Sequence, residues 1–296
     1  MISSTTKQNL LFGVNVAKSI IPELHNSIYK LIGTQDEYCF VASEIKNDDL
    51  QNAVQSIKIL GINGIMVENP YKGEIIRYLD DVDETAMTIG AVNTIVNKNG
   101  MLKGFNTEWL GALMPLADIM KVEIKRIGFI PKFLCDKKVG VIGVGNAARA
   151  IAYASLTAGA DLLIFNRTIS KAELMADEFK LLFPSAKIHF FDNKHAEKLL
   201  FCDIIINSTP VSIYANGDSP ISKDILRPDQ IVFEAIYPTP FHTKIIKEAQ
   251  DAGCNTIFGE EMFLYQTIFQ FELLTGIKPN EVVVRSVLQK LKSNSI

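Results

Sequence analysis

The chain has 296 residues, 48% of them hydrophobic, so it is long enough for two globular domains and lacks the polar bias of disordered proteins. Its formal net charge is −3 and no basic block occurs, which argues against nucleic acid or an anionic membrane as a partner and favours small molecules. The four cysteines are scattered without zinc-site spacing, and no apolar run approaches the roughly 18 residues of a membrane span, so we expect a metal-free cytoplasmic protein.

The first hundred residues alternate short apolar runs with helical patterns. Such alternation predicts βαβ units and a largely parallel sheet. The strands are expected at residues 10–14, 38–41 and 64–67, with helices from about Pro22 and over 49–60. Further on, Asn99-Gly100 separates two apolar runs, 94–97 and 101–102, and this dipeptide is typical of a hairpin turn. An antiparallel pair of strands is therefore expected here.

A second domain is expected after a helix at about 107–120 and a polar, irregular stretch, 121–138. The alternation of strands and helices restarts beyond that stretch. The buried strands are expected at residues 139–142, 162–165, 204–206 and 231–233. Two helices follow, at about 260–276 and 279–291, and the first ends at a glycine that suits the C′ position.

A glycine-rich turn follows the first strand of this second region. A Rossmann turn needs a glycine for the tight bend, a second glycine so that the backbone can approach a pyrophosphate, and a small third residue for close packing. Gly143, Gly145 and Ala148 occur in that order. The helix that begins at Asn146 and Ala147 directs its free N–H groups at the phosphates. The turn could also be purely structural, but the flanking strands and helix favour a dinucleotide site.

The residues at the ends of two later strands indicate which dinucleotide binds. Where NAD-binding proteins usually carry an acidic residue for the ribose, this chain has Asn166, Arg167 and Thr168. No carboxylate would repel a 2′-phosphate there and the guanidinium can grip it, so NADP(H) is predicted; the alternative is a solvated surface arginine. Ser208 and Thr209, after another buried strand, either contact the cofactor or simply form a loop.

Six separated segments resemble shikimate dehydrogenases in the same order along the chain. They are Phe12-Gly13 with Ser19 and Pro22 to Asn26, Asn69 to Lys72, Gly90 to Thr94, Gly104 to Glu108, Asn166 to Thr168, and Gly259 to Gly276. The resemblance implies an α/β protein with an N-terminal βαβ substrate-binding domain, 1–107 with 261–296, a Rossmann-type NADP-binding domain, 108–260, and a cleft between them. It also implies the NADPH-dependent, reversible reduction of 3-dehydroshikimate to shikimate in aromatic amino acid biosynthesis.

The functional residues of that family carry over onto matching positions of this chain. The matching residues are Lys72 and Glu108 for catalysis, Ser19, Asn93 and Gln266 for the substrate, and Gly259 beside the cofactor. A lysine ammonium near the reacting carbonyl can stabilise the developing alkoxide charge and supply the proton, and amides can bond a ring hydroxyl. The alternatives are that Lys72 is a solvated cation and that Asn93 and Gln266 are caps or surface amides.

Three positions in the expected substrate pocket depart from the family pattern. Ile21 replaces a serine that binds the substrate carboxylate, and Met66 and Glu68 replace an asparagine and a threonine. A lost charge-assisted hydrogen bond is worth roughly 1.5 to 3 kcal/mol, so plain shikimate should bind worse. Glu68 would repel an anionic substrate or attract an ammonium group, unless it points to solvent or pairs with Lys72. A closely related ring ketone, for instance an amino-bearing one, is therefore the challenger to shikimate.

Two further departures concern the catalytic pair and the cofactor. Glu108 stands where the family has an aspartate, one methylene shorter, and residues 212–213 are Ser-Ile where a Gly-Met pair is common. A misplacement of about 1 Å can cost on the order of a hundredfold in rate. A catalytically idle NADP-binding sensor is thus the alternative to the enzyme. The oligomeric state is left open, with a homodimer as one option.

Overall fold

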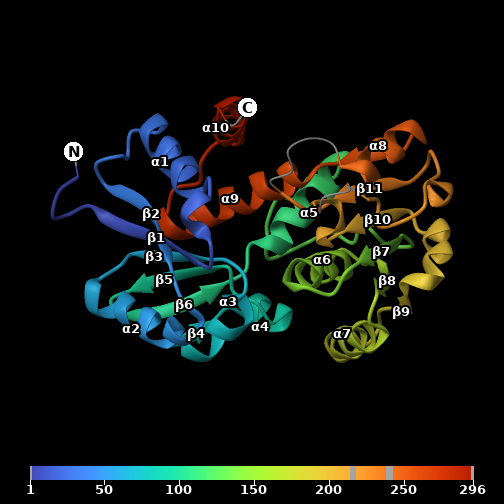
Figure 1. The fold of residues 1–296 in the computed structure, drawn as a ribbon, viewed down its shortest axis with the longest axis horizontal. Helices are drawn as coiled ribbons and strands as arrows, with labels where there is room; N and C mark the ends of the chain where they lie inside the picture. Colours follow the sequence, from blue (N-terminus) through green and yellow to red (C-terminus); the bar gives the residue numbers. More distant parts are fainter. Residues whose placement is uncertain (1, 214–217, 238–242, 295–296) are drawn as a thin grey trace. The chain divides into compact units, whose positions relative to one another are not determined.

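The chain folds into two compact units. The computed structural model describes residues 2–213, 218–237 and 243–294. Unit 1 comprises residues 1–107 and 266–296, and unit 2 comprises residues 108–265 (Figure 1). The described part of each unit holds one six-stranded sheet, so the predicted α/β fold is confirmed. The assignment of a substrate and a nucleotide to the two predicted domains stays a prediction.

The sheet of unit 1 is mixed. Its strands are β1 (Lys7–Gly13), β2 (Tyr38–Glu44), β3 (Gly64–Val67), β4 (Asp81–Val82), β5 (Thr94–Lys98) and β6 (Met101–Phe105), in the order β2-β1-β3-β5-β6-β4. β1 pairs in parallel with β2 and β3, as βαβ units require, whereas β5 pairs antiparallel with both β3 and β6. The predicted hairpin is present, because Asn99 and Gly100 both adopt positive φ between β5 and β6.

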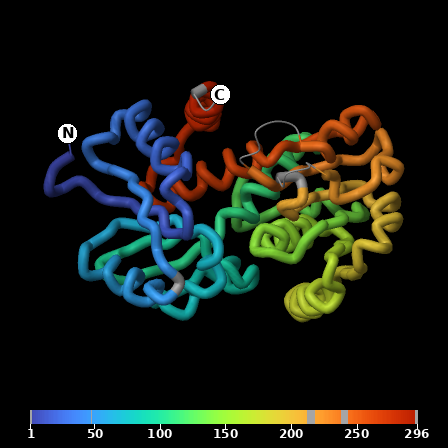
Figure 2. The backbone as a smooth tube through the Cα atoms, viewed as in Figure 1, coloured from blue at the N-terminus to red at the C-terminus, as the bar shows by residue number. Residues whose placement is uncertain are grey.

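Helices flank this sheet and bring the end of the chain back to its beginning. They are η1 (Val16–Lys18), α1 (Ile21–Leu31), η2 (Asn47–Asp49), α2 (Leu50–Leu60), α3 (Tyr71–Glu74), η3 (Ile75–Tyr78), α4 (Glu84–Ile89), the second part of α9 (Gly259–Thr275) and α10 (Glu281–Asn294). α10 lies beside α1 (Figure 2). Tyr38 Oη donates to the Thr275 carbonyl at 3.0 Å, and Asn63 Nδ2 donates to the Leu274 carbonyl at 2.8 Å. These bonds tie the end of α9 to the first strands of unit 1.

The sheet of unit 2 is parallel throughout. Its strands are β7 (Lys138–Ile142), β8 (Asp161–Asn166), β9 (Ile188–Asp192), β10 (Ile204–Asn207), β11 (Ile231–Glu234) and β12 (Asn255–Ile257), in the order β12-β11-β10-β7-β8-β9. The chain runs outward from β7 through β8 to β9 and then returns to the other side of β7 with β10. The strand order therefore reverses between β7 and β10, which is the switch point where doubly wound sheets bind ligands.

Helices connect the strands of unit 2. They are α5 (Glu108–Ile119), α6 (Asn146–Thr157), α7 (Ile169–Leu182), η4 (Asn193–Phe201), η5 (Pro210–Ile213), η6 (Lys223–Ile225), α8 (Lys244–Asp251) and the start of α9. The sequence patterns predict neither β9 nor β12 and give no bounds for α7. In α7 the buried Met175 and Phe179 are accompanied by an exposed Leu181, so no single apolar face stands out in the sequence. β9 and β12 are the two edge strands, and their residues are mostly half-buried or exposed.

Candidate active site

Lys72 lies in a short segment that follows β3. The Glu68 N–H donates to the Phe12 carbonyl at 2.8 Å, which continues the pairing of β1 and β3 by one residue. The Asn69–Pro70 peptide bond is cis. The Lys72 carbonyl accepts a hydrogen bond from the Val92 N–H at 2.7 Å, so the lysine backbone is fixed to the segment before β5. These bonds hold Lys72 at the carboxyl end of β3, the kind of edge at which open α/β sheets bind ligands.

The Lys72 side chain is buried beside a carboxylate. Only 8% of the side chain is exposed, and its Nζ lies 3.4 Å from Oε2 of Glu68, whose side chain is 35% exposed. A buried ammonium benefits from such a partner, because burial disfavours its charged form. Lys72 is therefore not a solvated surface cation. The sequence left open whether Glu68 faces solvent, a ligand or Lys72, and in the structure it pairs with Lys72.

Asn93, directly before β5, is held by a small hydrogen-bond network and is 2% exposed. Its Oδ1 accepts from the Thr107 N–H at 2.9 Å and from the Thr94 hydroxyl at 3.0 Å. Its Nδ2 donates to the Thr107 hydroxyl at 3.0 Å. The orientation of the amide is therefore fixed, and the second hydrogen on Nδ2 can serve a ligand hydroxyl or carbonyl.

The other positions of unit 1 singled out in the sequence lie on α1, β3 and α9. Ser19 precedes α1, and its Oγ accepts from the Ile21 N–H at 3.3 Å. The side chains of Ile21 and Met66 are in the packed interior, with 5% and 2% exposure. Gln266 is half-buried on α9. The two apolar residues that replace polar family positions thus stabilise the core of unit 1 and present no side-chain donor to a ligand.

In unit 2, the glycine turn joins β7 to α6. Gly143 has a φ of 112°, a conformation that residues with a Cβ rarely adopt. A Cβ added at Gly145, by contrast, would meet no described atom within 4 Å, so a ligand can approach this part of the backbone. Ala148 is fully buried in α6, which opens with residues 146–147. The three small residues therefore have the properties that a pyrophosphate turn requires.

Asn166, Arg167 and Thr168 lie where β8 ends and α7 begins. β8 is the neighbour of β7, so this segment and the glycine turn follow adjacent parallel strands at the same edge of the sheet. Asn166 Nδ2 donates to the Thr168 carbonyl at 2.8 Å, which shapes the turn, and Arg167 between them is exposed. The guanidinium is thus available to an anionic ligand from solvent.

Ser208 and Thr209 form the turn after β10, and their hydroxyls are engaged within the protein. The Ser208 hydroxyl donates to the Ile142 carbonyl at 2.7 Å, and the Thr209 hydroxyl donates to Asn207 Oδ1 at 2.7 Å. Both side chains therefore shape the loop. A hydroxyl oxygen has two lone pairs, so each can still accept from a ligand.

Two further predicted site residues start helices. Glu108 is the first residue of α5 and is 5% exposed. Gly259 is the first residue of α9, and a Cβ there would collide with the Ile236 carbonyl oxygen, so the close approach of α9 to the end of β11 requires glycine. The side chains at 212–213, where the sequence departs from the family, lie outside the described residues.

Sequence reasoning missed two residues at the carboxyl end of β11. Glu234 is a carboxylate that is only 2% exposed. Tyr237 stacks on Phe263 with the ring centroids 4.7 Å apart, and burial, assisted by Glu260, raises the pKa of Tyr237 to about 12. The tyrosine therefore keeps its proton at neutral pH. An acidic residue directly after the buried run 231–233 marks the position of Glu234 in the sequence, but not its contacts.

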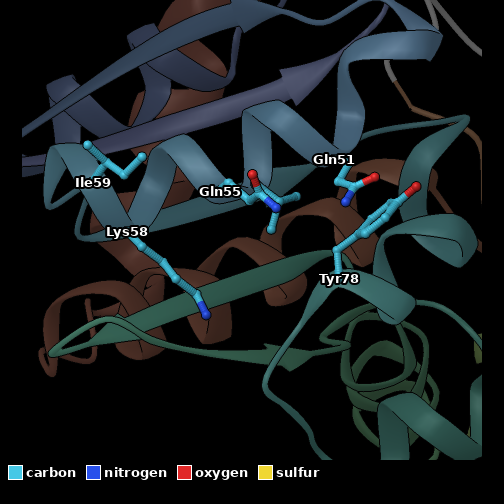
Figure 3. Close-up of a pocket in the computed structure, with 6 residues that line it drawn as sticks. Gln51, Gln55, Lys58, Ile59 and Tyr78 are labelled. Atoms are coloured by element: carbon cyan, nitrogen blue, oxygen red, sulfur yellow. The ribbon is translucent and has the colours of Figure 1, made fainter.

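A separate pocket of unit 1 lies along α2 (Figure 3). It has a volume of about 420 Å³ and is lined by Gln51, Val54, Gln55, Lys58, Ile59 and Tyr78. Lys58 is paired with Asp80 at 2.6 Å. None of these lining residues belongs to the predicted site, so the pocket is distinct from the surroundings of Lys72.

Three features of the described residues concern other kinds of site. No helix in the ranges given above has the length and apolar character needed to cross a membrane. Among the same residues, no three or more His, Cys, Asp or Glu side chains are grouped so that they could hold a metal ion. The four cysteines are free thiols.

Comparison with known proteins assigns the chain to a family. The family model of the shikimate dehydrogenase substrate binding domain matches residues 11–95, and that of shikimate / quinate 5-dehydrogenase matches residues 130–221. The shikimate dehydrogenase (NADP(+)) of Methanocaldococcus jannaschii is 37% identical over 98% of this chain and 99% of its own length. The chain belongs to the shikimate dehydrogenase family.

Solved structures of shikimate dehydrogenases have the same fold. One in complex with NADP+ has a TM-score of 0.87 and 35% identity, and the match covers 98% of this chain and 97% of that chain. One from Listeria monocytogenes in complex with shikimate and NAD has a TM-score of 0.86 and 28% identity, covering 97% and 98%. The predicted family and two-domain α/β fold are confirmed, and the prediction of a shikimate dehydrogenase-like, NADP-dependent oxidoreductase agrees with these relatives.

Proposed function

We propose that this protein is an NADP-dependent oxidoreductase that interconverts a ring ketone of the 3-dehydroshikimate type and the corresponding alcohol. The observation that carries the proposal is the buried Lys72 side chain at the end of β3, in a chain of the shikimate dehydrogenase family. Burying an ammonium costs free energy, and a fixed cation at a strand edge can stabilise a developing oxyanion. Unit 1 is then the substrate-binding domain and unit 2 the NADP-binding domain.

The glycine turn of unit 2 fits a pyrophosphate. The positive φ of Gly143, the open space beside Gly145 and the buried Ala148 meet the three requirements of a dinucleotide turn. α6 presents its first N–H groups to the phosphates, and the exposed Arg167 can pair with a 2′-phosphate. When bound, NADPH supplies the hydride that reduces the carbonyl carbon of the substrate.

Lys72 and Glu108 are the proposed catalytic pair. The Lys72 ammonium donates a hydrogen bond to the carbonyl oxygen, stabilises the negative charge that develops there and delivers the proton as the alcohol forms. Glu108, a buried carboxylate at the start of α5, is proposed to accept a hydrogen bond from a ring hydroxyl of the substrate. Asn93 orients a neighbouring ring hydroxyl through its second amide hydrogen, and Ser19 and Gln266 supply further polar contacts.

The pairing of Glu68 with Lys72 favours a second candidate substrate in the same reaction class. An ammonium that lies 3.4 Å from a carboxylate attracts an anionic substrate less strongly than an ammonium without one. Ile21 and Met66 are buried and apolar, so neither side chain can donate to a carboxylate. The default substrate is 3-dehydroshikimate, and the challenger is an amino-bearing analogue with less net negative charge.

The test of this function is the oxidation of NADPH by 3-dehydroshikimate and by a panel of amino and deoxy analogues, with wild type and Lys72→Ala side by side. We expect wild type to turn over at least one of these ketones and Lys72→Ala to lose that turnover. If NADPH binds tightly to wild type while none of the ketones reacts, the enzyme proposal fails and a sensor role takes its place. Brisk turnover of 3-dehydroshikimate itself would remove the argument from Glu68.

The preference for NADP over NAD is proposed to depend on Arg167. The exposed guanidinium has a 2′-phosphate to bind only in NADP, and a charge-assisted hydrogen bond lost from that contact weakens binding about tenfold. Arg167→Ala should therefore weaken NADP+ binding and leave NAD+ binding unchanged, measured by calorimetry with both nucleotides. A ratio of the two affinities that does not change would exclude Arg167 from this role.

We also propose that the protein acts in the cytoplasm on small molecules, without a nucleic-acid partner. A net charge of −3 without a basic block and four free thiols support this. The oligomeric state stays open, with a homodimer as one option. Sedimentation distinguishes it from a monomer, because the chain mass is 32.9 kDa.

A further inference from the structure

Glu234 is a buried carboxylate at the carboxyl end of β11, and it accepts hydrogen bonds from three segments of unit 2. The side-chain amide of Asn207 donates to both carboxylate oxygens, at 3.0 and 3.1 Å. The Ile236 N–H donates to Oε1 at 3.3 Å, and the Thr243 hydroxyl donates to Oε2 at 3.2 Å. A carboxylate with 2% exposure is costly unless its lone pairs are used in this way.

The Asn207 amide transmits the position of Glu234 to the loop after β10. Asn207 is fully buried, and its Oδ1 accepts from the N–H of Thr209 at 3.0 Å and from the hydroxyl of Thr209 at 2.7 Å. Because Oδ1 faces two donors and Nδ2 faces three acceptor oxygens, the two of Glu234 and the Thr209 carbonyl at 3.4 Å, the amide can lie only one way round. The carboxylate therefore stabilises, together with Thr209 itself, the amide orientation that holds the loop.

The loop held by Asn207 contacts the glycine turn. The Ser208 hydroxyl donates to the carbonyl of Ile142, the residue that precedes Gly143, at 2.7 Å. A Cβ on Gly143 would lie 2.6 Å from Ser208 Oγ and 3.2 Å from Thr209 Cγ2. The loop thus packs on the turn that is proposed to bind the pyrophosphate, and a displaced loop would displace one wall of that turn.

The hydroxyl of Thr243 bonds to Glu234 instead of capping the helix that follows it. Thr243 is the N-cap residue of α8, a position where a threonine side chain usually accepts from the helix backbone. It makes no such cap bond and donates to the carboxylate. Gly259 also approaches this strand end closely, against Ile236 and the Glu234 carbonyl. The start of α8, the start of α9 and the loop after β10 therefore meet at the end of β11.

We infer that Glu234 is a positioning residue of the cofactor site: its carboxylate orients Asn207 and thereby fixes the loop of Ser208 and Thr209 against the glycine turn. The inference rests on the proposed function in that the turn binds NADP(H). A glutamine at 234 would keep the shape but offer Asn207 one acceptor oxygen and one NH2 group, which would oppose the Asn207 NH2. The charge and second acceptor of Glu234 are thus what the role requires.

The experiment compares the folded apoprotein and its binding of NADPH in Glu234→Gln, Glu234→Asp and a matched control. The control is Gln230→Leu, which removes buried hydrogen bonds to the Leu199 and Cys202 carbonyls at the amino end of the same strand. We measure thermal unfolding without ligand and NADPH affinity by fluorescence titration. Glu234→Gln should weaken NADPH binding about tenfold. Its melting temperature should be no lower than that of Gln230→Leu, and Gln230→Leu should bind NADPH as tightly as wild type. Glu234→Asp, which keeps both acceptors, should recover part of the affinity.

The inference is overturned if Glu234→Gln folds and binds NADPH within about twofold of wild type. If Glu234→Gln does not fold, Thr243→Val decides, because it removes one donor and leaves the carboxylate in place. Weaker NADPH binding by a folded Thr243→Val supports the role, and unchanged binding overturns it. Failure of wild type to bind NADPH at all would instead contradict the proposed function, so the two failures are distinguishable.

Discussion

The proposed sites of the two units are built from different parts of the chain, the backbone in unit 2 and side chains in unit 1. In unit 2 the nucleotide turn depends on backbone properties, namely the positive φ of Gly143, the open space at Gly145 and the close packing of Ala148. Such a site needs small residues at fixed spacing, and the sequence displays them. In unit 1 the proposed substrate site depends on side chains, and Glu68 places a carboxylate beside Lys72 while β3 keeps its place in the sheet. A side-chain site can therefore change its specificity without any sign in the fold.

The largest expected effect tests whether the side-chain site of unit 1 still catalyses. Lys72→Met keeps the length and burial of the side chain and removes its charge and proton. We expect kcat for the preferred ketone to fall about a thousandfold, because both the oxyanion stabilisation and the proton donor are lost, while NADPH binding is unchanged. Steady-state rates of NADPH oxidation and NADPH titration measure the two quantities.

The control for this change is Lys58→Met, in the same unit. Lys58 is also an ion-paired lysine, with Asp80 at 2.6 Å, but it lines the pocket along α2. Lys58→Met should leave kcat within about twofold of wild type, since surface ion pairs contribute little to stability. Equal losses in the two variants would mean that the effect of Lys72 is structural.

The backbone site of unit 2 is tested by placing one methyl group at two glycines of the same turn. Gly145→Ala adds a Cβ in open space, so it should leave the free energy of unfolding within about 0.5 kcal/mol and weaken NADPH binding about a hundredfold. Gly143→Ala faces a φ of 112° and the Ser208 hydroxyl, so it should cost about 2 kcal/mol of folding free energy. Urea unfolding and NADPH titration separate the two outcomes. If Gly145→Ala binds NADPH normally, the ligand does not approach the backbone there.

The fold was predictable where strands are buried on both faces. β3 was expected at 64–67 and is found at Gly64–Val67, and β10 and β11 extend the predicted runs by one residue each. The two-residue β4 and the edge strands β9 and β12 were missed because they bury too few side chains to leave an apolar run.

The residues of the candidate site could be proposed from the sequence, whereas their contacts could not be predicted. The sequence identified Lys72 and Glu68 and left open whether the carboxylate faces solvent, a ligand or the lysine. It did not identify Glu234, because the role of that residue depends on Asn207 and Thr243, which approach it only in the folded sheet. Contacts between distant segments depend on register and side-chain direction, which no local pattern contains.

A smaller effect tests whether Glu68 has altered the substrate preference. Glu68→Gln removes the negative charge beside Lys72 at nearly constant shape. We expect the KM for 3-dehydroshikimate to fall and the KM for an amino-bearing analogue to rise, because Glu68 would no longer repel an anion or attract an ammonium group. The fall should be limited to about tenfold, because the Glu68 side chain is partly solvated. Glu74→Gln, which breaks the exposed pair with Arg77, is the matched control and should change neither KM. Parallel changes of both KM values in Glu68→Gln would show that charge does not decide the preference.

The pH dependence of stability should also differ between the units. His25 of unit 1 is fully buried between Phe40 and Phe271, and burial lowers its pKa from 6.5 to about 3. In the unfolded state His25 binds a proton below about pH 6.5, whereas in the folded state it stays neutral down to about pH 3. The free energy of unfolding is therefore highest above pH 6.5 and falls toward pH 3, by at most about 1.4 kcal/mol per pH unit. Urea unfolding followed by circular dichroism from pH 7 to pH 4 measures this slope.

The change of the unfolding free energy with pH, and not its absolute value, shows whether His25 causes the sensitivity to acid. His25→Leu changes packing at every pH, so it should lower stability overall while flattening the dependence on pH between 6.5 and 4. His189→Leu, at an exposed histidine of unit 2, should leave the slope unchanged. The single tryptophan, Trp109, belongs to α5 of unit 2, so its fluorescence follows that unit while circular dichroism follows both. An acid slope that persists in His25→Leu, or that appears first in the Trp109 signal, would show that another group makes the protein sensitive to acid.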